Sequence, residues 1–92
     1  MKEEFVKRVV KYILSKKYPN IIDVYVTSER DMWSRFADDE KNYVYNIFLV
    51  NEDPEIFTDE NEWSKLKELI RNTLKAAGIK QGSRIYNEFL EN

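Results

Sequence analysis

The side chains that carry most protein chemistry are missing from this chain of 92 residues, which contains no cysteine and no histidine. A thiol nucleophile, a disulfide framework and a zinc site built from thiolate or imidazole ligands are therefore excluded. Nucleophile–histidine–acid triads are excluded in their usual form. Carboxylates, lysines and tyrosines remain as candidate acids, bases and nucleophiles, so any chemistry must lie in clusters of these residues.

Two segments have the composition of a cation or phosphate site but lack its spacing. Residues 51–62 follow the register of a calcium-binding EF-hand loop, but Pro54 interrupts it and Ile56 stands where that loop needs glycine. Residues 78–82 begin and end with glycine, yet they lack the P-loop spacing and follow a helix. The acidic run 38–40 is expected to be solvated. The sequence predicts no catalytic residue, no metal and no cofactor, and the chain is not expected to be an enzyme.

A polar segment at 29–41 contains three large apolar side chains, those of Met32, Trp33 and Phe36, close to Arg35. Exposing such a side chain to water costs roughly 1.5–3 kcal/mol, so each is expected to be buried. One alternative is that the segment folds back on its own domain. The other is that Trp33, Arg35 and Phe36 form a binding hot spot, because tryptophan and arginine are enriched at such sites.

Residues 42–50 are predicted to form a strand that is apolar on both faces. One face carries Tyr43, Tyr45, Ile47 and Leu49, and the other carries Val44, Asn46, Phe48 and Val50. A sheet with one solvated face should alternate apolar and polar residues. An apolar strip is thus expected on the face away from the helices, where Tyr25 and Tyr86 would extend it. Three alternatives stay open: the 29–41 segment or the C-terminus covers the strip, a protein partner or second copy does, or nucleic-acid bases stack on it.

Charge is segregated along the chain, although the formal net charge is only −2. Twelve of the 17 acidic residues lie between residues 20 and 62, and both predicted helices carry basic rows. The rows consist of Lys7 and Lys11 on the first helix and of Lys67, Arg71 and Lys75 on the second. Like charges four residues apart weaken a helix slightly. Three interpretations of the rows stay open: a solvated face, a surface for an acidic partner, or a contact with a phosphate backbone. The sequence pI near 5.2 argues against the phosphate-backbone contact.

Hydrophobic periodicity predicts five elements in the order α-β-β-α-β. The helices are expected at 3–18 and 59–77, and the strands at 21–28, 42–50 and 83–89, with a short terminal helix as the alternative to the last strand. Asp59 is the predicted N-cap of the second helix, and Gly78 with Ile79 is the predicted C-cap. The expected fold is a single α+β domain over residues 1–92, a two-layer sandwich with two helices on one face of a small, mainly antiparallel sheet.

These features together predict a small interaction or assembly module without enzymatic activity. Residue usage typical of AT-rich genes suggests a phage structural or accessory protein, and the alternative is a nucleic-acid-binding accessory protein that uses the basic rows. The expected partner is another protein or a second copy, and the expected location is the cytoplasm, or the virion or host cytoplasm for a phage protein. The predicted partner-binding residues are Trp33, Arg35, Phe36, Tyr25, Tyr43, Tyr45, Phe48 and Tyr86.

Overall fold

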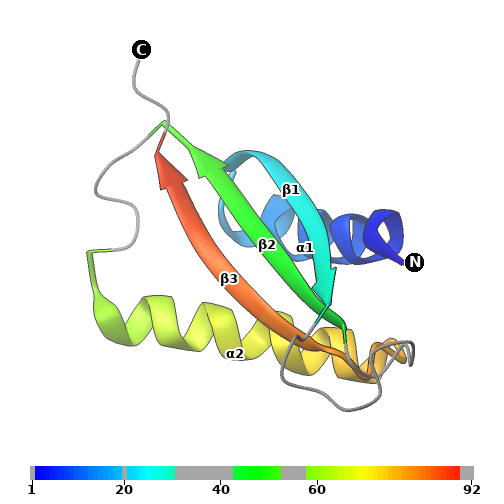
Figure 1. The fold of residues 1–92 in the computed structure, drawn as a ribbon. Coiled ribbons are helices and arrows are strands. Elements are labelled where there is room, and N and C mark those ends of the chain that lie inside the picture. The colour runs from blue at the N-terminus through cyan, green and yellow to red at the C-terminus, as the bar shows by residue number, and fades with distance from the viewer. Residues whose placement is uncertain (1, 20, 31–42, 53–57, 90–92) are drawn as a thin grey trace.

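The computed structural model describes residues 2–19, 21–30, 43–52 and 58–89. Its elements are α1 (Glu3–Lys17), β1 (Ile21–Arg30), β2 (Tyr43–Asn51), α2 (Glu60–Ala76) and β3 (Gly82–Phe89) (Figure 1). The predicted α+β fold and its α-β-β-α-β order are confirmed, and the last element is a strand. Among the described residues, no helix is long and apolar enough to cross a membrane.

The sheet has the strand order β1-β2-β3, so β2 lies in the centre. β1 pairs with β2 in the antiparallel direction, whereas β3 pairs with β2 in the parallel direction. The sheet is therefore mixed. Parallel neighbours cannot be joined by a tight turn and need a crossover, which α2 supplies between β2 and β3.

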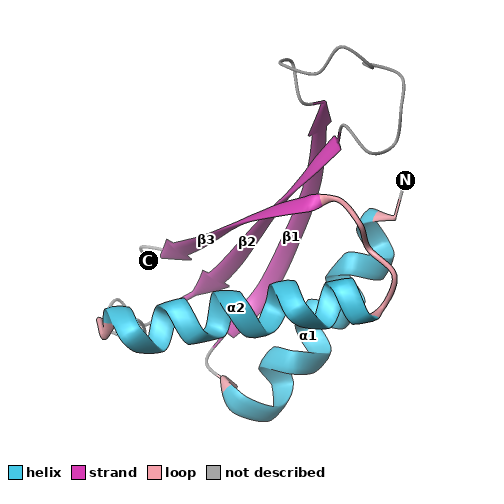
Figure 2. Ribbon diagram, turned by 90° about the horizontal axis from the view of Figure 1, so that it is seen from below, coloured by secondary structure: helices cyan, strands magenta, loops and turns pink. Residues whose placement is uncertain are grey.

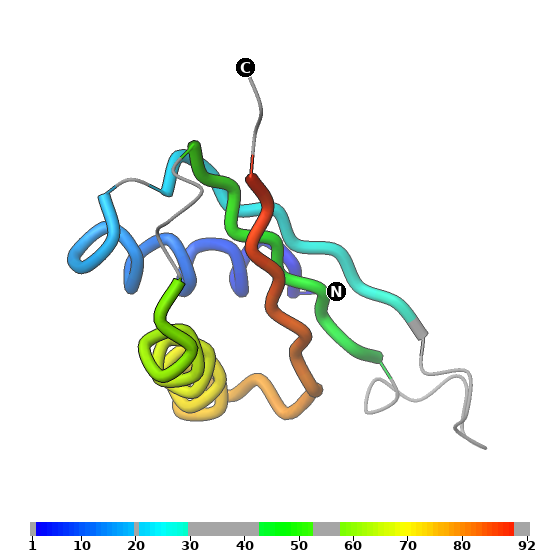
Figure 3. Tube along the Cα trace, turned by 90° about the vertical axis from the view of Figure 1, so that its left-hand side faces the viewer, coloured from blue at the N-terminus to red at the C-terminus, as the bar shows by residue number. Residues whose placement is uncertain are grey.

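Both helices lie on the same side of the sheet (Figures 2 and 3). Their apolar faces and one face of the sheet form a single core cluster that includes residues of all five elements. Its fully buried members include Val10 from α1, Ile47 and Leu49 from β2, and Ile70 from α2, each 0% exposed. The opposite face of the sheet is turned away from both helices, and we call it the open face.

Local sequence signals fix both ends of α2. The Asp59 carboxylate accepts hydrogen bonds from the backbone N–H groups of Asn61 (2.9 Å) and Glu62 (3.4 Å), as an N-cap should. At the other end Gly78 adopts a φ of +93°, and the Ile79 N–H donates to the Leu74 carbonyl at 2.9 Å. This bond and that from Gly78 N–H to Lys75 O form a Schellman motif. Ile79 is thereby buried in the core, as the sequence predicted.

Candidate functional site

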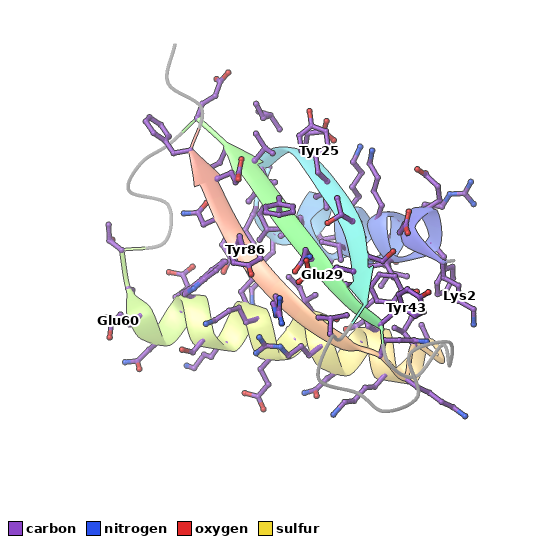
Figure 4. All side chains as sticks on the ribbon, in the orientation of Figure 1. Lys2, Tyr25, Glu29, Tyr43, Glu60 and Tyr86 are labelled. Carbon is purple, nitrogen blue, oxygen red and sulfur yellow. The ribbon has the colours of Figure 1, made fainter. Side chains whose placement is uncertain are left out.

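Three aromatic residues form a row across the open face. The register places Tyr25 of β1 and Tyr86 of β3 on either side of Phe48. The rings of Phe48 and Tyr86 are stacked, with centroids 5.1 Å apart and planes 18° from parallel. Tyr25 and Tyr86 remain 53% and 41% exposed, and both lie on the side that faces the viewer in Figure 4. The structure thus brings together three of the predicted partner-binding residues.

Beside the aromatic row, charged side chains bridge the two edge strands. Arg84 of β3 and Glu29 of β1 form an ion pair with an Nη1–Oε1 distance of 2.5 Å, and the Glu29 side chain reaches over β2 (Figure 4). Asn46 of β2 is paired in register with Arg84 and is only 8% exposed. Within the part of the chain that the structure describes, its Oδ1 is buried and has no hydrogen-bond partner.

The expected apolar strip is smaller than the sequence suggested, because Asn46 and Val50 are buried and Phe48 and Val44 are half-buried. The inclusion of Tyr45 among the partner-binding residues was wrong. Tyr45 lies on the helix-facing side, is 2% exposed and belongs to the core, and its hydroxyl accepts a hydrogen bond from the Lys2 N–H at 3.4 Å. Tyr43 is half-buried at the start of the same strand.

The other partner-binding predictions, Trp33, Arg35 and Phe36, lie outside the described residues. Phe89 is paired in register with Asn51, which is fully buried, yet Phe89 is 45% exposed because it lies at the end of an edge strand. The predicted protein or self partner stays a prediction.

Three of the five basic-row residues have an aromatic or an anionic partner. The Lys7 ammonium lies 5.8 Å from the centroid of the Tyr25 ring, and that of Lys67 lies 5.4 Å from the Trp63 ring. Lys11 forms an ion pair with Asp23, with an Nζ–Oδ1 distance of 3.1 Å. Arg71 and Lys75 instead line a cavity next to β3. The rows are therefore not one uniform solvated surface.

A cavity of about 400 Å³ opens between the C-terminal half of α1 and the start of β1. It forms because the chain turns sharply after α1, so that the last helical turns lie beside the first residues of the strand. The β1–β2 register also shifts between Ile21 and Asp23, and such irregularities redirect side chains at the edge of a sheet. The cavity is lined by Lys11, Leu14, Ser15, Tyr18, Pro19, Ile21, Ile22, Asp23 and Val24. We call it the α1–β1 pocket.

The α1–β1 pocket has an apolar floor and a polar rim. Leu14 and Val24 are buried at 2% and 1% exposure and belong to the core. The side chains of Lys11 and Asp23 are 50% and 32% exposed, so their ion pair stands at the solvent side. A cavity of this size with an apolar lining and a few convergent polar groups is typical of small-molecule sites.

Two titratable groups of the α1–β1 pocket are perturbed. The pKa of Asp23 is lowered, first by a hydrogen bond from the Val24 N–H (2.8 Å) and then by Lys11. The pKa of Tyr18 is raised, mainly by burial and then by its hydrogen bond to Glu62, whose Oε1 accepts from the Tyr18 hydroxyl at 2.9 Å. Titratable groups with shifted pKa values occur more often at functional sites than elsewhere in a protein. Asp23 is held as a carboxylate and Tyr18 as a neutral phenol.

Sequence reasoning identified Lys11 but missed Asp23 and the floor of the pocket. A signal was available, because a connection as short as residues 18–20 must place the end of α1 beside the start of β1. A lysine two turns before the end of the helix then lies near an acid just inside the strand. Among the described residues, no group of three or more carboxylates is arranged to hold a metal ion.

Comparison with known proteins gives little guidance. No protein-family model matches the chain, and no curated protein matches it. A search of solved structures found similarity to the crystal structure of an organic hydroperoxide resistance protein OsmC from Legionella pneumophila, described as a predicted redox protein and regulator of sulfide bond formation. The similarity has a TM-score of 0.43 and 16% sequence identity, and it covers 94% of this chain and 61% of that one. This chain thus spans about three fifths of that protein's length.

The predicted function needs correction. The solved structure that was found is described as a predicted redox protein and not as a phage structural or assembly protein. We withdraw the interaction or assembly module, together with its nucleic-acid-binding alternative. The similarity to OsmC is too low to transfer an activity, and this chain has no cysteine.

Proposed function

We propose that this protein binds a small zwitterionic molecule with an apolar body, such as a free apolar amino acid, in the α1–β1 pocket. The observation that carries the proposal is the Lys11–Asp23 ion pair at the rim of a cavity of about 400 Å³ with an apolar floor. The apolar body would lie against Leu14 and Val24, and the charged head would meet the two rim residues. The proposal assigns no catalytic step to the chain, in line with the expectation that it is not an enzyme.

The ion pair selects the charge type of the ligand. A ligand with a single charge would pair with Lys11 or with Asp23 and would leave the other residue without its partner. A zwitterion replaces both partners at once, because its carboxylate can meet the Lys11 ammonium and its ammonium can meet the Asp23 carboxylate. Charge-assisted hydrogen bonds of this kind are stronger than hydrogen bonds between neutral groups. We therefore expect zwitterions to bind more tightly than acids or amines of the same shape.

Three probes with the same branched apolar body test this selection. These are L-leucine, 4-methylvalerate and isoamylamine, titrated at millimolar concentration into ¹⁵N-labelled protein at neutral pH. We expect leucine to shift the amide resonances of residues 11–24 at the lowest concentration. The proposal fails if no probe shifts these resonances, or if isopentanol, which carries no charge, binds as well as leucine.

A pair of charge-neutralising variants completes the test. Lys11→Met keeps the length of the side chain but removes its charge, and it should abolish the preference for leucine. Lys65→Met makes the same change on the exposed surface of α2 and should leave the preference intact. Equal behaviour of the two variants would show that the Lys11–Asp23 pair does not recognise the ligand.

A further inference from the structure

A second cavity lies at the corner where α2 leads into β3. It has a volume of about 260 Å³ and is lined by Arg71, Leu74, Lys75, Ile79, Gln81, Gly82 and Ser83. Leu74 and Ile79 are buried and form the apolar base, which the Schellman motif at the end of α2 fixes in place. Among the described residues, the lining contains two cationic side chains and no acidic one, so the electrostatic potential of these residues favours an anion.

The two cations of this cavity differ from the other basic-row residues, because among the described residues neither has an anionic or an aromatic partner. Among the described residues, the only hydrogen bond of the Arg71 side chain runs from Nε to the Ser83 carbonyl oxygen, at 3.4 Å. That bond uses Nε and leaves the two terminal nitrogens of the guanidinium for other acceptors. Lys75 forms no ion pair or hydrogen bond through its ammonium within the described part of the chain.

Helix stability does not account for this arrangement. A lysine in the last turn of α2 favours the negative end of the helix dipole, which explains Lys75 alone. Arg71 lies one turn earlier, and like charges at this spacing weaken a helix by a few tenths of a kcal/mol. Lys67 and Lys80 add positive charge on either side in the sequence, and Glu68 is the only acid from residue 67 to residue 83. The concentration of positive charge therefore needs another explanation.

We infer that the α2–β3 cavity binds the phosphate group of a small phosphorylated molecule. The fork of N–H donors on an arginine matches phosphate oxygens, and a lysine adds a compact positive charge. Ser83 also lines the cavity, and its side chain carries a hydroxyl of the kind that can donate a hydrogen bond to phosphate. This site is separate from the α1–β1 pocket in both its residues and the charge that it selects.

The test uses inorganic phosphate and a phosphomonoester, O-phosphoserine, titrated into the full chain at low ionic strength. We expect amide shifts centred on residues 71–83, with serine as the control that lacks phosphate. Arg71→Gln and Lys75→Met should each weaken phosphate binding by about tenfold, the effect of one lost charge-assisted bond, whereas Lys65→Met should not. Lys75→Met is the more informative variant, because no described contact of that side chain supports the fold.

Three results would overturn the inference. The first is the absence of any shift near residues 71–83 with both phosphate probes. The second is binding of a single-stranded oligonucleotide at this corner without binding of phosphate or phosphoserine, which would indicate a nucleic-acid backbone contact instead. Equal affinity of the Lys65→Met and Lys75→Met variants for phosphate would also exclude the cavity as the site.

Discussion

The rings of Phe48 and Tyr86 pack face to face across the parallel pair β2–β3, with 5.1 Å between their centroids. Each ring therefore presents one of its faces to the other. The Tyr25 ring, at the other end of the aromatic row, has the Lys7 ammonium over it. An aromatic platform for nucleic-acid bases needs ring faces that are open to solvent, and this row offers few of them.

The stacked pair should be visible as an energetic coupling. In a double-mutant cycle with Phe48→Leu and Tyr86→Leu, we expect a coupling free energy of about 0.5–1.5 kcal/mol in chemical denaturation, the range for aromatic pairs. The cycle of Phe48→Leu with Tyr25→Leu is the matched control, because these residues are also neighbours in register. A larger coupling in the control cycle would contradict the stacked geometry.

The Asp23 carboxylate should make stability depend on acid pH. Its pKa in the native state lies below the ordinary value of 3.8. At a pH between these two pKa values, the folded protein therefore binds fewer protons than the unfolded chain. The stabilisation is present above that ordinary value and is lost as the pH falls through the lower native pKa. Because Asp23 and Lys11 are both partly exposed, it should amount to less than about 1 kcal/mol.

Asp23→Asn tests this dependence. The variant should be less stable than the parent protein in urea denaturation at pH 7, and the difference should disappear at a pH below the native pKa of Asp23. Glu60→Gln, a neutralisation on the exposed first turn of α2, controls for general charge effects. A difference between Asp23→Asn and the parent that does not change with pH would show that the carboxylate charge contributes nothing.

The two glycines should respond in opposite ways to substitution by alanine. Gly78 has a φ of +93°, where a Cβ atom is strained by roughly 1–2 kcal/mol, so Gly78→Ala should lower the free energy of unfolding by about that amount. Gly82 lies in β3 with ordinary φ, and an added Cβ would meet nothing within 4 Å. Gly82→Ala should be neutral or slightly stabilising. Because an added Cβ would meet nothing within 4 Å at either glycine, thermal denaturation of both variants isolates the effect of the backbone conformation.

Asn46 is a position where we expect a substitution to raise stability. Its buried Oδ1 lacks a partner among the described residues, and an unsatisfied buried acceptor costs about 1–3 kcal/mol. Asn46→Val removes the acceptor and suits a central strand, so it should raise the free energy of unfolding by about 1 kcal/mol. Thr27→Val makes a similar change at the exposed neighbour of Asn46 on β1 and should have a smaller effect.

The elements of this fold follow from local signals in the sequence. Asp59 and the pair Gly78–Ile79 mark the ends of α2 because capping depends on neighbouring residues alone. The alternation of Ile22, Val24 and Val26 predicted β1, although Ile22 is half exposed beside the register shift. The strands extend one or two residues beyond the predicted ends, to Arg30 and Asn51, since pairing with a neighbour prolongs a strand.

The side chains that face each other across the fold were harder to predict. Both faces of β2 are apolar, so the sequence allowed Tyr45 or Phe48 to point toward the helices, and a shift by one residue exchanges the two sets. The pairing of β3 with β2 rather than β1 depends on where α2 returns the chain. The register shift between Ile21 and Asp23, which lies beside the α1–β1 pocket, is not indicated by any residue type in the sequence.

The central place of β2 has a consequence for local opening of the fold. Because β1 and β3 pair with its two sides, the backbone amides of β2 point alternately to one neighbour and the other. An edge strand can fray while its outer amides exchange with water, but β2 is released only when both pairings break. In native-state hydrogen exchange, the amides of residues 44–50 should thus form the slowest group, and their exchange should report the global unfolding of the chain.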